Sequence, residues 1–515
     1  MIPKEQIPPI LRPERVQPVA LASIAERFNL ETPSDFQNLT VTGISMNTGD
    51  LRSGDLFVAM PGKKTHGALF IAKALELGAS AIVTDAAGLA LAGELAVPVM
   101  LLENPRAHLG DLAAFVYGNV AGNLPHLFAT TGTNGKTSTS YLLEGILRQV
   151  GEVTGLTSTA ERHIAGEIIV SRLTTPESPE MQALIARMRE KQVSSIAIEV
   201  SAQALSQLRV DGLHFDVAGF TNLSHDHLDD YADMQAYLEA KAALFTKKRA
   251  SQGVICLDSA FGERFAELSE IPFVTITSAP AVQADWRVSV TEETPSRTAF
   301  ELSGPNGELI TSSVPILGAH MAANAGLAIV MMIQVGFDWQ LIAEKISQGI
   351  EAYLPGRTEH VSGDTGPNVY VDFGHSPDAF LNTLAAVRKV TRGKVIMVFG
   401  ADGDRDASKR PAMASVAVEG SDILVITDHH PRFEDPAAIR EALVNSARLA
   451  RSDAEIYEVS PPELAIRKAV ALAQPGDSIL WAGPGHQDYR DIKGVRTPYS
   501  ARAEARAALR EQGWS

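Results

Sequence analysis

The stretch 129–140, "ATTGTNGKTSTS", contains the residue types that hold a phosphate. Its glycines let backbone N–H groups face an anion, Lys136 would reach the terminal phosphates, and the Thr137 hydroxyl would bind Mg²⁺. Thr130 stands where the usual P-loop pattern has its first glycine. The competing interpretation is a glycine-containing turn with an incidental lysine, so the flanking elements must decide between the two.

The flanking elements favour the phosphate loop. The preceding run "LPHLFAT" has strand length, and in "TSYLLEGILRQV" the residues Leu142, Leu143, Ile146 and Leu147 recur at helical spacing. A strand, a glycine loop and a helix in this order bring backbone N–H groups and a helix N-terminus to one point. The loop alone is compatible with a kinase, a motor or a ligase.

The composition is that of an acidic globular protein. The chain has 515 residues and a formal net charge of -16, which predicts about three domains and argues against a nucleic-acid-binding surface. A single cysteine, Cys256, excludes an internal disulfide framework and fits a reducing compartment. With no signal segment and no long apolar span, we expect a soluble cytoplasmic protein.

The hydrophobic pattern predicts an α/β protein of three domains. Residues 1–121 read as a small αβ leading domain, and residues 122–352 alternate strands and helices as in a P-loop ATPase with a mostly parallel sheet. Pro355 and Gly356 mark a break before residues 353–515, where four apolar strands predict a Rossmann-like, doubly wound domain. In such sheets ligands bind at the carboxyl ends of the strands.

Seven motifs occur in the order and approximate spacing of the Mur ligases. They are "GTNGKTS", "IEVSAQALSQLRV", "FTNLSHDHLDDY", "YLEAKAALF", "LPGRTEHV", "DFGHSPDAF" and "GADGDRDASKRP". The chain resembles this family over nearly its whole length, and in particular the members that add the third amino acid of the peptidoglycan stem. The resemblance implies an ATP-dependent acid–amino-acid ligase of cytoplasmic cell-wall synthesis, a process linked to cell shape and cell division.

The resemblance also implies the reaction. The terminal carboxylate of UDP-N-acetylmuramoyl-L-alanyl-D-glutamate attacks the γ-phosphate of ATP, and the incoming amine then attacks the acyl phosphate. Such a reaction needs charge neutralisation more than a nucleophilic side chain. The implied ligands are ATP, Mg²⁺, the UDP-N-acetylmuramoyl-dipeptide and an amino acid, bound by a monomer that has no nucleic-acid or membrane partner.

The family pattern carries catalytic roles to Lys136, Glu199, His227 and Lys241. Thr137, Glu199 and His227 are the expected Mg²⁺ ligands, although an imidazole is a less usual ligand for this hard cation. Lys241 matches a lysine that is carbamylated to N6-carboxylysine, whereas a lysine on a helix is by default an exposed residue. The expected ATP-binding residues are Gly132, Thr133, Asn134, Gly135, Lys136, Thr137, Ser138, Asn324, Arg357, Asp372 and His375.

The expected contacts to the UDP-muramoyl-dipeptide come from two regions. In the leading domain, "NTG" at 47–49 replaces the "DSR" usual in the family, so that Thr48 keeps a hydroxyl but an acid and an arginine are lost. In the central domain, Arg209 suits a pyrophosphate or carboxylate because its planar guanidinium donates paired hydrogen bonds. The other expected contacts are Thr174, Thr175, Ser201 and Gln207.

The third-amino-acid pocket departs from the family pattern. Enzymes that add meso-diaminopimelate commonly carry "DNPR" and "GHE"; this chain has "TDHHPRFEDP" and "GPGHQDY". His429, His430 and Gln487 therefore replace Asp, Asn and Glu, whereas Arg432 is kept. The expected pocket residues are Arg405, Asp428, His429, His430, Arg432, Gly483 and Gln487.

Two interpretations of this pocket follow. Either Asp428 or Glu434 replaces the lost acids and the substrate is a diamino acid such as L-lysine or L-ornithine, or the distal end of the substrate is unlike meso-diaminopimelate altogether. We favour the first, with meso-diaminopimelate itself as the alternative substrate. A metal site at the two histidines is disfavoured, because adjacent side chains on an extended loop point apart and no cysteine is nearby.

Two rival functions remain open. Folylpolyglutamate synthetase shares the P-loop and the carbamate lysine, but lacks the leading uridine domain and the "DHHPR" segment. A catalytically inactive protein that binds a UDP-sugar and ATP is of a different class. Retention of Lys136, Glu199, His227 and Lys241 together argues against it, because a pure binder has no need of every group that stabilises phosphoryl transfer.

Overall fold

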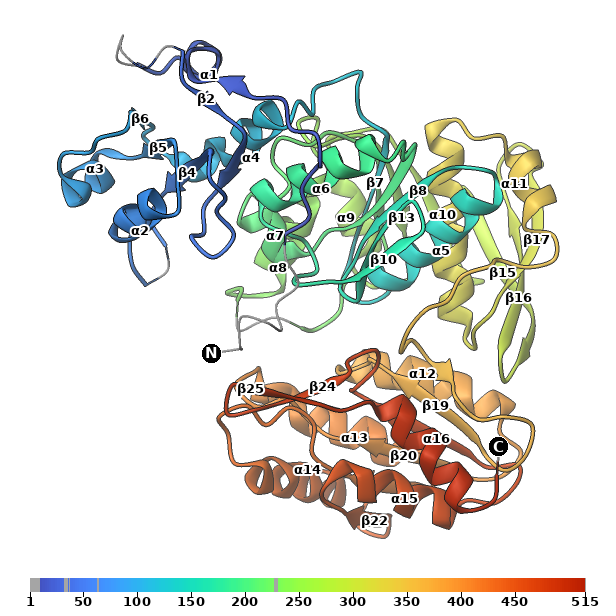
Figure 1. The fold of residues 1–515 in the computed structure, drawn as a ribbon. Helices are drawn as coiled ribbons and strands as arrows, with labels where there is room; N and C mark the ends of the chain where they lie inside the picture. The colour runs from blue at the N-terminus through green and yellow to red at the C-terminus, as the bar shows by residue number, and fades with distance from the viewer. Residues whose placement is uncertain (1–9, 32–35, 37, 63, 227–229, 515) are drawn as a thin grey trace.

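The computed structural model describes residues 10–31, 36, 38–62, 64–226 and 230–514. Within them the chain forms three main sheets, one in each of the three predicted ranges. Figure 1 shows the N-terminal and central domains side by side, with the C-terminal domain below them. The α/β class and the three-domain organisation are therefore confirmed, while the boundaries at 121/122 and 352/353 stay a prediction.

The N-terminal domain is built on a parallel sheet of four strands in the order β3-β4-β5-β6, among the described residues. The central strand β4 is buried throughout because helices cover the sheet. Its elements are β1 (Val19–Ala20), α1 (Leu21–Phe28), β2 (Thr40–Val41), β3 (Gly43–Ser45), β4 (Asp55–Ala59), η3 (Gly67–Phe70), α2 (Ile71–Glu76), β5 (Ala81–Thr84), α3 (Ala86–Ala92), β6 (Val99–Leu101) and α4 (Pro105–Val116).

The central domain holds the longest sheet. Its described strands follow the order β10-β9-β8-β11-β7-β12-β13-β14-β15-β16-β17. The elements are β7 (His126–Thr131), α5 (Lys136–Gln149), β8 (Thr154–Thr157), β9 (Glu161–Ile164), β10 (Glu167–Val170), α6 (Ser178–Glu190), β11 (Ser195–Glu199), α7 (Ala202–Ser206), β12 (Phe215–Phe220), α8 (Met234–Ala242), η4 (Ala243–Phe245), β13 (Ala250–Cys256), α9 (Gly262–Glu267), β14 (Phe273–Thr277), β15 (Trp286–Thr294), β16 (Arg297–Ser303), β17 (Leu309–Val314), α10 (Ala319–Val335) and α11 (Trp339–Lys345).

The pleat of the central strands sorts their side chains into two cores. Phe128 and Ala197 face α5 and α10, whereas Leu127 and Ile198 face α6 and α8 on the other side of the sheet. In the order of the sheet, the neighbouring strands β8-β11-β7-β12-β13-β14-β15 are mutually parallel, as predicted. Antiparallel pairs extend both edges, through β9 and β10 on one side and β16 and β17 on the other. This parallel centre brings the carboxyl ends of β7, β11 and β12 together at one edge.

The C-terminal domain has a second doubly wound sheet, with the order β18-β19-β23-β20-β21-β22 in the described residues, and helices fill both of its faces. Its elements are β18 (Glu359–His360), β19 (Asn368–Asp372), α12 (Pro377–Val390), β20 (Val395–Phe399), η5 (Ala407–Lys409), α13 (Arg410–Gly420), β21 (Ile423–Ile426), α14 (Pro436–Ala450), β22 (Glu455–Glu458), α15 (Pro462–Leu472), β23 (Ser478–Ala482), β24 (Tyr489–Ile492), β25 (Val495–Pro498) and α16 (Ala501–Glu511).

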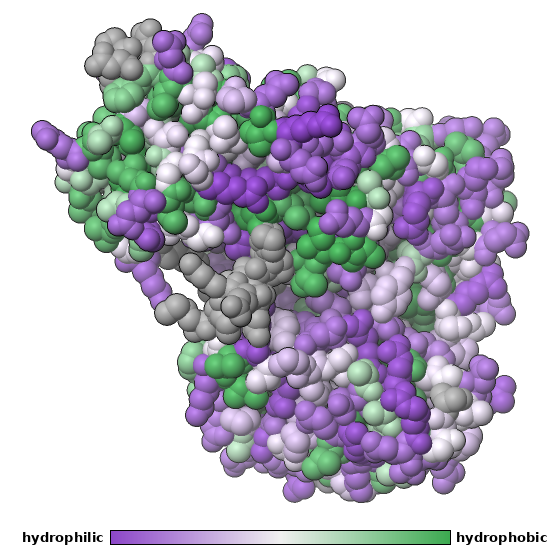
Figure 2. Space-filling model, viewed as in Figure 1, coloured by the Kyte–Doolittle hydropathy of each residue, from purple (hydrophilic) through white to green (hydrophobic). Residues whose placement is uncertain are grey.

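The visible face of the molecule is mixed in polarity. Figure 2 shows hydrophilic side chains over most of the C-terminal domain, and apolar side chains gathered mainly over the N-terminal and central domains. Among the helices that the structure describes, none combines the length and the apolar character needed to cross a bilayer.

Candidate active site

The glycine loop lies between β7 and α5, at the centre of the large sheet. Gly132 and Gly135 have φ angles of 148° and 87°, a region that side chains with a Cβ rarely adopt. A Cβ on Gly132 would also lie 1.9 Å from Thr221 Oγ1. Lys136 begins α5, and its Nζ donates hydrogen bonds to Gly132 O (3.0 Å) and Thr133 O (2.9 Å). The predicted strand, loop and helix are therefore confirmed.

A carboxylate stands beside the loop. Glu199 ends β11, and its Cα pairs with that of Thr130 on β7, so the parallel register places this acid at the start of the loop. It is 1% exposed and accepts hydrogen bonds from Thr137 Oγ1 (3.0 Å), Thr159 N (2.8 Å) and Thr159 Oγ1 (3.0 Å). Hydroxyl and carboxylate oxygens are the hard donors that Mg²⁺ prefers, so Thr137 and Glu199 fit the ion. His227 lies outside the described residues.

Lys241 is a buried lysine, 1% exposed on α8, so the default of an exposed lysine does not apply. Its Nζ donates to Gly132 O at 2.7 Å and lies 4.3 Å from the centroid of the Tyr237 ring. Burial, followed by the charge of Lys136, holds the pKa of Lys241 well below its ordinary value. A lowered pKa increases the fraction of the neutral amine, which is the form that reacts with CO₂.

The C-terminal domain contacts the phosphate loop on the side where ATP is predicted to bind. Arg357 Nη2 donates to Thr137 Oγ1 at 2.8 Å, while its guanidinium lies 4.5 Å from the centroid of the Phe373 ring. Asn134 Nδ2 donates to Asp378 Oδ2 at 3.2 Å, which is a second link between the two domains. A third is the ion pair of Lys409 with Asp226 at 3.4 Å.

The remaining predicted ATP residues lie around this junction. Asn324 is on α10 and faces the loop, because a Cβ on Gly135 would approach its Oδ1 to 2.7 Å. Asp372 ends β19 and accepts hydrogen bonds from Thr358 N (2.8 Å) and Gly374 N (2.7 Å). His375 Nδ1 donates to Phe373 O at 2.9 Å, and burial lowers its pKa. Ser138 is buried in the first turn of α5.

The predicted dipeptide contacts in the central domain form one cluster next to Glu199. Thr175 Oγ1 donates to Glu199 O at 2.9 Å and accepts from Ser201 N at 3.1 Å, while Thr174 Oγ1 lies 2.9 Å from Thr159 Oγ1. Arg209 pairs with Glu177 at 2.9 Å and donates to Gln207 Oε1 at 2.7 Å. The structure thus brings these residues together, with Arg209 already engaged by an acid.

Thr48 lies, half-buried, in a loop of the N-terminal domain. Two residues further on, Asp50 accepts hydrogen bonds from Arg172 of the central domain, at 2.9 and 3.3 Å. An acid and an arginine are therefore present beside the "NTG" segment, although the arginine comes from elsewhere in the chain. Arg172 could not be predicted from the sequence, because a lone arginine in a loop gives no local signal.

The predicted third-residue pocket gathers at the carboxyl ends of β20, β21 and β23. The rings of His429 and His430 have centroids 4.2 Å apart, and His430 stacks on Tyr489 with centroids 5.3 Å apart. His430 Nδ1 accepts the backbone N–H of Asp491 (3.0 Å), so Nε2 carries the proton that is donated to Gln487 Oε1 (2.8 Å). His430 is therefore a neutral imidazole.

Adjacent histidines were expected to point apart, and this is wrong. Together with Asp402, His429 and His430 place donor atoms within 4.8 Å of one another. Gly483 borders the same group, because a Cβ there would lie 3.5 Å from His429 Cδ2. The loop turns both imidazoles inward, since His429 packs toward Asp402 while His430 is fixed by two hydrogen bonds.

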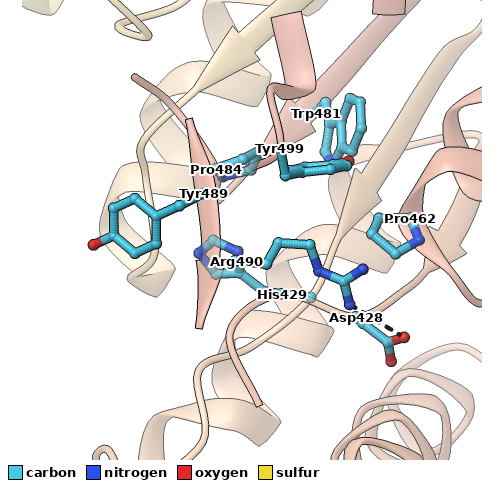
Figure 3. Close-up of a pocket in the computed structure, with 10 residues that line it drawn as sticks. Asp428, His429, Pro462, Trp481, Pro484, Tyr489, Arg490 and Tyr499 are labelled. Carbon is cyan, nitrogen blue, oxygen red and sulfur yellow. Dashed lines mark ion pairs between the residues drawn. The ribbon is translucent and has the colours of Figure 1, made fainter. Parts of the chain in front are cut away.

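The two acids expected to replace the family carboxylates are both engaged. Asp428 is paired with Arg440, accepts from Ser460 Oγ at 2.6 Å and lies 3.8 Å from Arg490. Figure 3 shows Asp428, His429 and Arg490 around a small cavity that Trp481 and Tyr499 also line.

Glu434 receives two hydrogen bonds from Arg410 Nη2, at 3.0 and 2.9 Å. The structure therefore argues against either acid as the partner of a substrate ammonium. Arg405 is exposed, whereas Arg432 is half-buried and has its Nη2 3.8 Å from Asp402 Oδ2.

Comparison with known proteins gives one consistent family. The model "Mur ligase family, catalytic domain" matches residues 40–117, "Mur ligase middle domain" matches 130–332, and "Mur ligase, glutamate ligase domain" matches 356–485. A UDP-N-acetylmuramyl-tripeptide synthetase of Leifsonia xyli subsp. xyli is 53% identical over 509 residues, 98% of this chain and 99% of that protein.

Two further relatives agree. A UDP-N-acetylmuramoyl-L-alanyl-D-glutamate–2,6-diaminopimelate ligase of Streptomyces coelicolor is 40% identical and covers 97% of this chain and 98% of its own. A solved structure of a ligase with the same printed name has a TM-score of 0.67 and 26% identity, and covers 97% of this chain and 100% of that one. The predicted ligase activity is thereby confirmed: the chain belongs to the Mur ligase family of ATP-dependent ligases.

Proposed function

We propose that this ligase adds a diamino acid with one carboxylate, L-lysine or L-ornithine, to UDP-N-acetylmuramoyl-L-alanyl-D-glutamate. The observation that carries the reaction is the buried cluster at the P-loop. There Thr137 bonds Glu199 at 3.0 Å, and Lys136 and Lys241 donate to the same carbonyl, Gly132 O, at 3.0 and 2.7 Å. A pure binding protein has no need of a buried amine, a half-buried amine and a buried acid at one phosphate loop.

Each residue then has a role in the first step. Bound Mg²⁺ would neutralise charge on the phosphates, and Thr137 and Glu199 would hold it, with His227 proposed as a further ligand. Lys136 and Arg357 place two cations where charge develops as the γ-phosphoryl group moves to the dipeptide carboxylate. The phosphate loop supplies backbone N–H groups, and the N-terminus of α5 adds its dipole. ADP leaves, and an acyl phosphate remains.

We infer that Lys241 acts as a carbamate. The ammonium first releases one proton to solvent. The neutral Nζ then attacks the carbon of CO₂: an N–C bond forms, one C=O π bond becomes a C–O⁻, and the nitrogen loses a second proton, so that a cation is replaced by an anion. This change suits the site, because burial and the nearby charge of Lys136 disfavour an ammonium at this position. The resulting carboxylate would lie next to the loop that binds the phosphates and would help to position the ion there.

The proposed third substrate follows from the charges in its pocket. His430 is buried and His429 is half-buried, and desolvation lowers the pKa of both imidazoles, that of His429 to about 3. Gln487 is neutral and already accepts from His430. Arg405 and Arg432 supply cations for the α-carboxylate of the incoming amino acid. The alternative is meso-diaminopimelate, which is favoured by the printed names of the relatives at 40% identity or less.

A phosphate-release assay tests the proposal. The enzyme is incubated with ATP, Mg²⁺ and UDP-N-acetylmuramoyl-L-alanyl-D-glutamate, and lysine, ornithine and meso-diaminopimelate are compared by kcat/KM. We expect turnover to require both the dipeptide and an amino acid, in a cytoplasmic reaction carried out by a monomer. Rapid ATP turnover with neither substrate would overturn the ligase mechanism. A tenfold preference for meso-diaminopimelate, about 1.4 kcal/mol, would overturn the substrate assignment alone.

A further inference from the structure

One carboxylate beside the predicted third-residue pocket lacks a strong partner. Asp402 follows β20 in the segment "GADGDRD", and its Oδ1 is buried without a hydrogen bond to any described residue. The nearest cationic group is Arg432, whose Nη2 lies 3.8 Å from Oδ2, beyond hydrogen-bond length. Native proteins rarely leave a buried carboxylate oxygen unpaired, so such an atom in a pocket points to a ligand.

The residue opposite Asp402 offers a second acceptor when its ring proton is on Nδ1. His429 Nε2 lies 3.7 Å from Asp402 Oδ1, and the imidazole is only 10% exposed. Burial first, and then the neighbouring His430, lower the pKa of His429 to about 3, so the ring is neutral at physiological pH. The charged neighbour that favours the ionised form of Asp402 is the guanidinium of Arg432, whose Nη2 lies 3.8 Å from Oδ2.

This pair fits an alkylammonium group. Two acceptors separated by 3.7 Å can both bind one nitrogen at ordinary hydrogen-bond lengths of about 2.9 Å. A primary ammonium has three N–H donors and no acceptor, so it complements a carboxylate and a neutral imidazole. Neither His429 nor His430 carries a charge that would repel it.

We infer that Asp402, assisted by His429, binds the distal ammonium of the third amino acid and determines the preference for a diamino acid. The inference rests on the proposed function, because it deepens the same site. The distal amine is the one that suits the pair, since a carboxylate partner stabilises the charged form of an amine. The α-amine has to be neutral to attack the acyl phosphate, so the same ion pair would oppose its reaction.

A metal ion is the competing ligand for this group of residues. His430 is poorly placed to complete such a site, because its Nδ1 accepts the N–H of Asp491 and its Nε2 donates to Gln487. A metal needs a free lone pair on the ring, which would require at least one of these bonds to break. Without His430, only Asp402 and His429 remain as ligands, and these two residues are enough to bind an ammonium.

The test compares Asp402→Asn with the parent enzyme. Lysine is compared with norleucine, which has the same chain length but lacks the ammonium, and kcat/KM is measured for each at saturating ATP and dipeptide. We expect the variant to lose about 30-fold or more in kcat/KM for lysine, as happens when one partner of a buried charge pair is removed. Norleucine should be unaffected or improved, and the KM for ATP unchanged.

Asp404→Asn is the matched control, because it makes the same charge change two residues away on an exposed side chain whose contact is Phe433 N. Asp404→Asn should leave the ratio of kcat/KM for lysine to kcat/KM for norleucine at the value of the parent. An equal ratio in the parent and in Asp402→Asn would overturn the inference while the proposed function stands. Failure of the parent to use any diamino acid would overturn the proposed function itself.

A metal titration separates the competing ligand. Stoichiometric binding of Zn²⁺ to the parent but not to Asp402→Asn, with no change in the ratio of lysine to norleucine, would replace the inference with a metal site. A lower ratio of kcat/KM for lysine to kcat/KM for norleucine in Asp402→Asn, with no zinc bound by the parent, supports the inference. Circular dichroism and the KM for ATP show whether the variant is folded, so a loss of structure is distinguished from a loss of recognition.

Discussion

Lys241 gives the sharpest test of the mechanism, because its amine and its alkyl chain have separate effects. Lys241→Ala removes the amine and three methylenes from a site that is 1% exposed. At about 0.8 kcal/mol for each buried methylene, the packing loss alone is roughly 2.4 kcal/mol. Lys241→Met removes the amine but keeps most of the volume, so we expect its melting temperature to stay near that of the parent.

Both variants lose the group that can become a carbamate. Removing one preorganised electrostatic group from an active site typically lowers kcat by about 10²–10³-fold, and we expect this loss in both. The Ala variant leaves a space beside Gly132 O in which a small anion fits, whereas the Met side chain fills it. Acetate should therefore restore part of the activity to Lys241→Ala and little to Lys241→Met.

The assay is phosphate release at rising acetate concentration, with chloride at matched ionic strength as the control. Full activity of Lys241→Met without acetate would refute the carbamate, because methionine carries no anion. Equal rescue of both variants would show that acetate acts elsewhere. Bicarbonate should raise the activity of the parent after CO₂ has been removed; as a small anion it should also restore part of the activity of Lys241→Ala, but little of that of Lys241→Met.

Three further predictions follow from particular contacts. Lys136→Ala should lower kcat by about 10²-fold or more, since it removes a cation beside the transferred phosphoryl group; phosphate release measures this, and a loss below tenfold would contradict it. Gln487→Glu should raise kcat/KM for meso-diaminopimelate relative to lysine, because it adds an acid beside His430; an unchanged ratio would speak against this position. Hydrogen bonds to Glu144 and Glu161, opposing burial, raise the pKa of His163 to about 9, so its contribution to stability should be complete below pH 6.5 and lost as the pH rises through 9. Melting temperatures of the parent and His163→Gln should therefore converge at high pH, and a gap that does not change with pH would contradict this.

Local patterns predicted the phosphate loop well, because strand, glycines and helix are adjacent in sequence and each follows its own periodicity. The burial of Lys241 was harder to predict, since one helical turn gives no sign of which side faces the loop. Arg172 and Asp402 escaped prediction for a different reason: their roles depend on residues far away in sequence. Asp402 becomes significant only because Asp428 is occupied by Arg440 and Arg490, and no spacing rule reports that.

The division of the predicted ATP site between two domains has a thermodynamic consequence. Arg357 bonds Thr137, Asn134 bonds Asp378 and Lys409 pairs with Asp226, so the nucleotide side is complete only when the domains are apposed. The C-terminal domain also carries the third-residue pocket. Ligands that favour the same apposed state must raise each other's affinity by the same factor, whichever binds first. With such a coupling free energy, ATP is bound and consumed mainly when the amino acid is bound as well.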